Sequence, residues 1–129
     1  MYYYIFGYKG CFHYNKAFKI LKEFDVTEIT VNDWVPEKLT HAIITQTRWS
    51  SDQLKMALKT NKMTTGNVTS PQVFVKKDGD FFLVGGHAKI EELLADAEKY
   101  VRWKSKFNEL VDQYKIEKTR ANFKRYSHN

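Results

Sequence analysis

The stretch YYYIFGYKGCF, residues 2–12, contains the decisive signal for the fold. Its first five residues are aromatic or β-branched and show no polar alternation, which predicts a buried central strand. The next four, Gly7-Tyr8-Lys9-Gly10, predict a turn bounded by glycines. From Cys11 onward apolar residues recur at intervals of three and four, which predicts a helix. The single cysteine of the chain therefore lies where a buried strand passes through a turn into a helix.

The segment after this helix predicts a second strand and more helix. Residues 27–32 predict the strand, and a β-α-β unit of this kind makes a parallel pair. Residues 33–49 are ambiguous, although Pro36 can open a short helix there. Ser50 or Ser51 is suited to cap a further helix.

The second half of the domain predicts a hairpin followed by a helix. Residues 72–75 and 80–84 flank Asp78-Gly79, a signal for a tight turn. Gly85-Gly86 ends the second of these strands, and a helix follows with Ile90, Leu93, Leu94 and Ala97 on one side. The predicted order is β-α-β-α-β-β-α with a helical tail, which makes an α/β domain with a mixed four-stranded sheet.

The net charge of +6 is confined to the end of the chain. Residues 1–98 contain 12 basic and 12 acidic side chains, whereas residues 99–129 contain nine basic and three acidic ones. We therefore predict a neutral domain over 1–98 and a basic helical extension over 99–129.

Composition excludes several classes of protein. The 16% aromatic content argues against disorder, and no apolar run reaches the length of about 20 residues that a membrane span needs. The N-terminus lacks the charged start and cleavage site of a signal peptide. One cysteine excludes an intramolecular disulfide and an all-thiolate metal site, and the histidines show no zinc-ligand spacing. We expect a cytoplasmic protein and no metal.

Cys11 is the first candidate for chemistry. A helix N-terminus offers unpaired N–H groups and the positive end of the helix dipole, and both favour a thiolate. Lys9 and His13, each two residues away, are potential cationic neighbours. The alternative is a buried cysteine that only packs.

Two further segments have a functional and a structural interpretation. Pro71 at the start of an apolar strand marks an edge strand; if its peptide bond is cis, Ser70 presents its main-chain groups to a bound peptide. Gly85-Gly86-His87-Ala88-Lys89 is either a plain strand–helix connection or a turn whose amides hold a carboxylate.

In this order the three segments resemble the glutaredoxins of the thioredoxin fold. The resemblance covers residues 2–32 and about 51–97, with 33–49 as an insertion and 99–129 as an addition. It implies a thiol–disulfide oxidoreductase with glutathione as co-substrate, in which Cys11 is the nucleophile. The motifs that match are Ile5-Phe6-Gly7, Gly10-Cys11, Thr69-Ser70-Pro71-Gln72-Val73-Phe74-Val75 and Gly85-Gly86.

The resemblance also implies a set of glutathione-binding residues. Lys9 or Tyr8 would meet the glycyl carboxylate, Ser70 would pair with the cysteinyl backbone, and Pro71 matches the family's cis-proline. The turn from Gly86 to Lys89 matches the one that holds the γ-glutamyl carboxylate. The full implied set is Tyr8, Lys9, Phe12, Ser70, Pro71, Gly86, His87, Ala88 and Lys89.

The active-site motif departs from the family pattern. Glutaredoxins have Cys-Pro-Tyr-Cys or Cys-Gly-Phe-Ser, whereas this chain has Cys11-Phe12-His13-Tyr14. Tyr14 replaces the resolving cysteine, so the resemblance implies a monothiol enzyme. His13 resembles the central histidine of Cys-x-His-Cys oxidoreductases, where it stabilises the thiolate. Lys89 stands where the family often has an aspartate that meets the γ-glutamyl amine.

Three functions follow as hypotheses. The leading one is monothiol deglutathionylation through Cys11. The second is an iron–sulfur carrier in which Cys11 of two chains and two glutathiones hold a [2Fe–2S] cluster, although bulky Phe12 would crowd it. The third is a non-catalytic module whose tail binds nucleic acid or an acidic partner. The basic and aromatic tail residues concerned are Lys115, Lys118, Arg120, Lys124, Arg125, Tyr114, Phe123 and Tyr126.

A simpler interpretation of the tail is favoured over nucleic acid. An apolar stripe within residues 100–114, which includes Trp103, Phe107 and Tyr114, would pack on the domain or on a second copy of the chain.

Overall fold

The computed structural model describes residues 1–63 and 68–127, with side chains described up to residue 120. It divides into two compact units, Met1–Glu92 and Leu93–Asn129. The boundary predicted from charge lies after residue 98. Residues 64–67, part of the predicted polar loop before Pro71, lie outside the described residues, as do the side chains of the last predicted tail residues.

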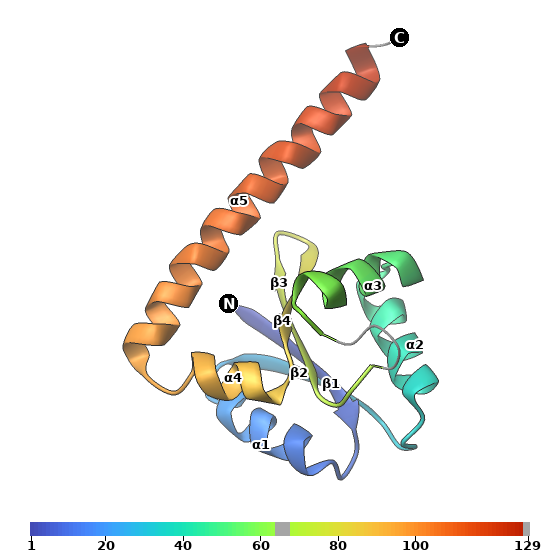
Figure 1. The fold of residues 1–129 in the computed structure, drawn as a ribbon, viewed down its shortest axis with the longest axis vertical. Coiled ribbons are helices and arrows are strands. Elements are labelled where there is room, and N and C mark those ends of the chain that lie inside the picture. Colours follow the sequence, from blue (N-terminus) through green and yellow to red (C-terminus); the bar gives the residue numbers. More distant parts are fainter. Residues whose placement is uncertain (64–67, 128–129) are drawn as a thin grey trace. The chain divides into compact units, whose positions relative to one another are not determined.

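The first unit is built on a four-stranded mixed sheet (Figure 1). Its strands are β1 (Tyr2–Tyr8), β2 (Asp25–Val31), β3 (Gln72–Lys77) and β4 (Asp80–Gly85), in the order β2-β1-β3-β4. Strand β1 runs parallel to β2 and antiparallel to β3, and β3 runs antiparallel to β4. The parallel β1–β2 pair and the antiparallel β3–β4 hairpin confirm the predictions, and β1 is central as its unbroken apolar sequence requires.

Helices cover both faces of this sheet. They are α1 (Phe12–Leu21), α2 (Pro36–Thr47), α3 (Ser51–Thr60) and α4 (His87–Leu93). Figure 1 shows α1 and α4 on one side of the sheet and α2 and α3 on the other. The strand order, strand directions and helix placement make an α/β fold of the thioredoxin-like type.

The element order contains one helix more than predicted. Both α2 and α3 lie between β2 and β3, so the ambiguous stretch 33–49 is largely helical. Pro36 occupies the first turn of α2, where its missing N–H is not needed, and the fully buried Leu39 and Ile43 fix the helix to the core. Arg48, at a φ of 61°, ends α2 in the left-handed conformation.

The start of α3 follows the predicted cap. Ser50 Oγ accepts a hydrogen bond from the Gln53 N–H at 3.1 Å, and Gln53 Oε1 accepts one from the Ser50 N–H at 2.7 Å. This capping box satisfies two main-chain donors and separates α3 from α2.

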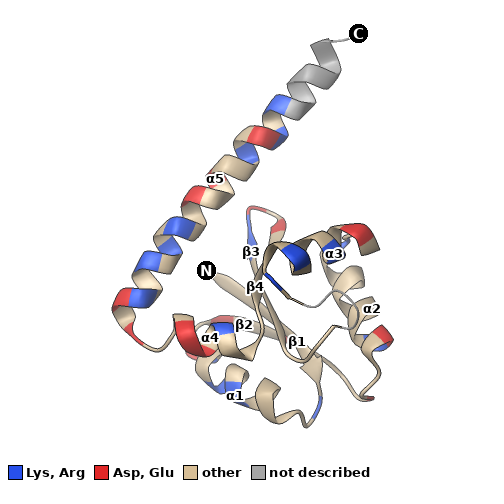
Figure 2. Cartoon of the chain, in the orientation of Figure 1, with Lys and Arg blue, Asp and Glu red and all other residues tan. Residues whose placement is uncertain are grey.

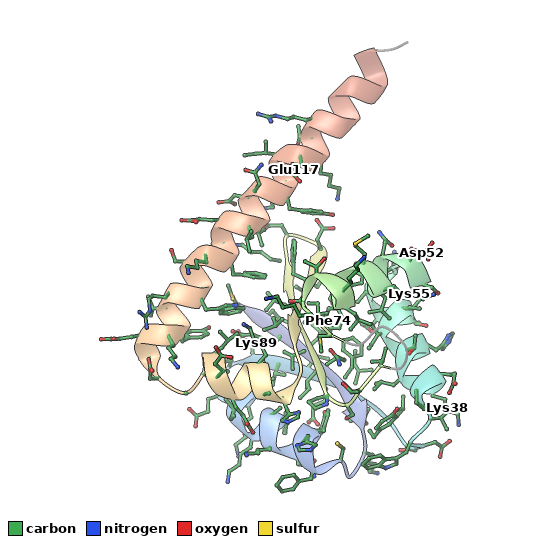
Figure 3. The ribbon with its side chains drawn as sticks, viewed as in Figure 1. Lys38, Asp52, Lys55, Phe74, Lys89 and Glu117 are labelled. Carbon is green, nitrogen blue, oxygen red and sulfur yellow. The ribbon has the colours of Figure 1, made fainter. Side chains whose placement is uncertain are left out.

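Aromatic rings form the core on the α2 and α3 side of the sheet. Phe74, labelled in Figure 3, is fully buried and contacts Phe6 edge-on at 5.3 Å between ring centroids. Trp49, which follows α2, contacts the same ring at 5.4 Å. The hairpin turn that returns the chain from β3 to β4 places Asp78 and Gly79 at φ values of 52° and 85°, the conformation that Asp-Gly favours.

The second unit contains α5 (Ala97–Ser127), a helix of 31 residues. The helical pattern restarts here after α4, and Asp96 Oδ1 accepts the Lys99 N–H at 2.7 Å at its beginning. Trp103 stacks on Phe107 within the helix, with ring centroids 5.2 Å apart. Figure 2 shows basic residues along the part of α5 that it colours, interspersed with acidic ones. The helix is confirmed, while its packing partner stays a prediction.

Candidate functional site

Cys11 lies between the end of β1 and the start of α1. Gly10, at a φ of 84°, allows the tight turn, and the Cys11 N–H donates to the Tyr8 carbonyl at 3.1 Å. The cysteine is the N-cap residue of α1, as the sequence predicts. Its side chain is only 4% exposed, and its sulfur lies 4.0 Å from the carbonyl oxygen of Ser70.

The segment before β3 therefore lies beside the thiol. The peptide bond between Ser70 and Pro71 is cis, as predicted. Ser70 makes a second contact with the turn, because its hydroxyl accepts the Tyr8 N–H at 3.0 Å. Ser70 thus contacts the turn around Cys11 twice, although the two segments are about 60 residues apart in sequence. One contact is with the Cys11 sulfur, and the other is the hydrogen bond from Tyr8.

Tyr8 forms the other wall around the cysteine. Its ring stacks on the exposed Trp34 at 5.1 Å, and its side chain is buried. Burial raises the pKa of Tyr8 above its usual value, and Glu37 and Cys11 nearby raise this pKa further. The phenol is therefore a neutral neighbour of the cysteine.

Tyr14, which the resemblance matches to the resolving cysteine, is fixed by a hydrogen bond and by close packing. Its hydroxyl donates to Glu28 Oε2 at 2.6 Å, and its ring packs so closely on Gly7 that a Cβ added there would lie 2.3 Å from Tyr14 Cδ2. Burial, followed by the hydrogen bond to Glu28, raises the pKa of Tyr14 far above its usual value.

The imidazole of His13 stacks on that of His87, with ring centroids 4.0 Å apart. The His13 side chain is exposed. Its role beside the sulfur stays a prediction. The stack joins the first turn of α1 to the first residue of α4, and the ion pair between Lys16 and Glu91, at 3.0 Å, joins the same two helices.

A pocket of about 520 Å³ lies beside this stack. It brings together four residues that the resemblance implies, Gly86, His87, Ala88 and Lys89, with the end of α3 and the segment before Ser70. Gln72 Nε2 holds that segment by donating to the Thr69 carbonyl at 3.0 Å. The residues that line the pocket are Thr60, Asn61, Lys62, Met63, Thr69, Val84, Gly85, Gly86, His87, Ala88 and Lys89.

Two predicted residues are exposed in the turn region. Lys9 is held through its backbone, whose N–H donates to the Val31 carbonyl at 2.9 Å, while its side chain is exposed. Phe12 is 71% exposed, directly after the buried cysteine. Their contacts with a ligand stay predictions.

Sequence reasoning missed several residues of this region. Trp34 lies in the stretch that was ambiguous, and nothing in its local pattern indicated that it would stack on Tyr8. Lys62 and Met63 follow the end of α3, and only the fold brings them opposite α4. A lysine just after a helix carries no signal by itself. Gly7 does carry a signal, because a glycine within a buried strand indicates a close approach of another group.

The described part of the chain contains neither a cluster of metal-ligating side chains nor a helix suited to span a membrane. No group of three or more His, Cys, Asp or Glu side chains there is arranged to hold a metal ion; His128 lies outside it. None of the helices described is both long and apolar enough to cross a membrane. Comparison of the chain with protein-family models, curated proteins and solved structures finds no match.

Proposed function

We propose that this protein is a glutathione-dependent thiol–disulfide oxidoreductase that acts through Cys11 alone. The observation that carries the proposal is the contact between Cys11 Sγ and the Ser70 carbonyl, at 4.0 Å. Through this contact the N-cap cysteine of α1 lies beside the main chain of Ser70, which precedes β3 and is not paired in the sheet. A helix N-terminus is a position that stabilises negative charge on sulfur.

The chemistry needs two exchange steps. The Cys11 thiolate attacks the glutathionyl sulfur of a mixed disulfide, a Cys11–glutathione disulfide forms, and the substrate leaves as a thiolate that takes up a proton. A second glutathione, as its thiolate, attacks the glutathionyl sulfur of this intermediate. Glutathione disulfide leaves and the Cys11 thiolate is regenerated, so one substrate mixed disulfide is reduced to its thiol and one reduced glutathione is oxidised, the second half of the glutathione disulfide coming from the substrate.

The monothiol character of the proposal rests on Tyr14. The residue three positions after the cysteine is a tyrosine hydrogen-bonded to Glu28, and the sequence contains no second cysteine. The Cys11–glutathione disulfide therefore has no internal thiol to resolve it. An external thiol must do so.

The experiment is treatment of the full chain with glutathione disulfide, followed by intact mass measurement. We expect one adduct of about 305 Da per chain, the mass of one glutathionyl group gained by thiol–disulfide exchange. Reduced glutathione should remove it, and Cys11→Ser should not form it. The same variant should lose turnover of a glutathionylated peptide. A wild-type chain that forms no adduct while folded, yet forms one in urea, would make Cys11 a packing residue and end the proposal.

A further inference from the structure

The pocket beside Cys11 is positively charged. Its titratable lining residues are Lys62, His87 and Lys89, and its lining includes no Asp or Glu. Among the described residues neither lysine forms an ion pair with a carboxylate. The acid nearest in sequence to Lys89 is Glu91, and that side chain is paired with Lys16 at 3.0 Å.

The surrounding sequence adds no negative charge. Residues 53–77, which include the end of α3 and the segment before β3, contain no Asp or Glu. Residues 81–90, which include the end of β4 and the start of α4, contain none either. The two stretches that supply the whole lining of the pocket are thus free of acids, so neither can neutralise its lysines.

The pocket and the thiol lie at two ends of one short segment. Thr69 lines the pocket, and Ser70, the next residue, lies 4.0 Å from the sulfur through its carbonyl oxygen. Gly86 lines the pocket and also lies close to this segment: a Cβ added at Gly86 would be 3.4 Å from the Pro71 carbonyl oxygen. A ligand whose sulfur reacts at Cys11 and whose chain follows residues 69–71 therefore ends among the lysines.

We infer that the pocket favours negative charge and disfavours an ammonium group at the far end of a bound thiol, so that glutathione binds less tightly than the same molecule without its amine. This inference rests on the proposed function for the reacting sulfur. A carboxylate or other acid in the pocket is attracted by Lys62 and Lys89, whereas an ammonium group is repelled by both and finds no acid in the lining. The resemblance to glutaredoxins implies that the γ-glutamyl end of glutathione would lie in this pocket. That end carries both a carboxylate and an amine, so the amine opposes binding here.

The test compares two unreactive ligands that differ only in this amine. S-methylglutathione retains the ammonium group, and N-acetyl-S-methylglutathione has lost it. Binding of each to the full chain is measured by calorimetry or by chemical-shift titration at low salt. We expect the acetylated ligand to bind about three- to tenfold more tightly, the effect of two partly exposed charges. The difference should shrink at high salt.

Two variants that change the net charge equally test whether the difference in affinity arises in the pocket. Lys89→Glu should reverse the preference, so that S-methylglutathione binds more tightly. Lys55→Glu changes the net charge equally at an exposed position of α3 that does not line the pocket, and it should leave the preference unchanged. Figure 3 labels both lysines. Both variants are surface changes, and their folding is checked by thermal melting.

The outcomes separate this inference from the proposed function. Equal binding of the two ligands, tighter binding of S-methylglutathione, no binding of either, or an equal effect of both variants overturns the inference. Adduct formation at Cys11 is measured independently by mass. An adduct without the preference leaves the proposed function standing and removes the inference. The preference without an adduct supports the charged pocket and removes the proposed function.

Discussion

His13 and His87 stack face to face, with ring planes inclined by 19° and centroids 4.0 Å apart. One ring belongs to the helix that begins beside the cysteine, and the other lines the pocket. The contact therefore connects the reactive end of the site to the part that would hold the rest of a ligand.

A double-mutant cycle should detect this stack. His13→Ala, His87→Ala and the double variant should give a coupling free energy of about 0.5–1.5 kcal/mol at pH 8, typical of paired aromatic rings. Urea unfolding measures it. The control cycle pairs His13→Ala with His41→Ala, an exposed residue of α2, and should give no coupling. Equal coupling in both cycles would mean that the stack contributes nothing.

Gly7→Ala should destabilise the fold strongly. The new Cβ would lie 2.3 Å from the Tyr14 ring and 2.6 Å from Ser70 Oγ, so buried groups must move. We expect a loss of about 2–4 kcal/mol in the free energy of unfolding. Gly86→Ala is the matched control, because its nearest contact is 3.4 Å and it should cost far less. Similar melting temperatures for the two variants would contradict the packing described.

Tyr14→Phe should change stability and its dependence on pH. Loss of the hydrogen bond to Glu28 should cost about 1 kcal/mol at pH 7. The raised pKa of Tyr14 means that the folded protein keeps this phenol protonated where the unfolded chain ionises it, above about pH 10. Its contribution to stability is therefore full below that pH and lost above it, by up to about 1.4 kcal/mol per pH unit.

Urea unfolding between pH 9 and pH 11 measures this difference. Wild type should lose stability more steeply than Tyr14→Phe. Above about pH 10, the slopes of the free energy of unfolding against pH should differ by the equivalent of one proton. Tyr8, whose pKa is also raised, is present in both proteins and contributes equally to both slopes. Parallel curves would show that Tyr14 ionises in the folded state as it does in the unfolded chain.

Trp34→Ala should expose the cysteine. Trp34 covers Tyr8, which is 6% exposed and borders Cys11. We expect faster alkylation of the thiol by iodoacetamide and a loss of about 1 kcal/mol in stability from the missing stack. Met56→Ala, an exposed apolar residue of α3, serves as control and should change neither quantity appreciably. An unchanged alkylation rate in Trp34→Ala would show that this ring does not shield the site.

Truncation after Lys99 should reveal what the tail covers. The apolar stripe that includes Trp103, Phe107 and Tyr114 is expected to dock this helix, and burying such a stripe stabilises by about 25 cal/mol per Å². We expect a lower free energy of unfolding or dissociation of an oligomer, measured by urea titration and by mass in solution. If both stay unchanged, the tail is a free appendage, which favours a role in binding a partner.

The fold was predictable largely because its signals are local. The apolar run of β1, the Asp78-Gly79 turn and the cap at Ser50 each specify a conformation through neighbours in sequence. The helix α2 was only half predicted, because its amphipathic pattern is short and its buried residues, Leu39 and Ile43, gain their meaning from the sheet they cover.

The sequence predicted individual residues of the candidate site but not the contacts between them. Cys11 and the Ser70-Pro71 segment have signals of their own, and the fold brings them within 4.0 Å. The contact of His13 with His87 depends on how α4 packs against α1, and the place of Lys62 depends on where α3 ends. Contacts of this kind are set by tertiary packing, which a pattern along the chain does not specify.

The tyrosine at position 14, in a sequence with one cysteine, has a consequence for the order of the proposed reaction. A chain with two active-site thiols closes its own disulfide in a unimolecular step. With its single cysteine, this chain would need a second molecule to open the adduct that we propose on Cys11. Its lifetime then varies inversely with the concentration of free thiol and with the fraction of that thiol that is ionised. The share of chains that carry an adduct would thus follow the supply of reduced thiol, as a bimolecular rate law requires.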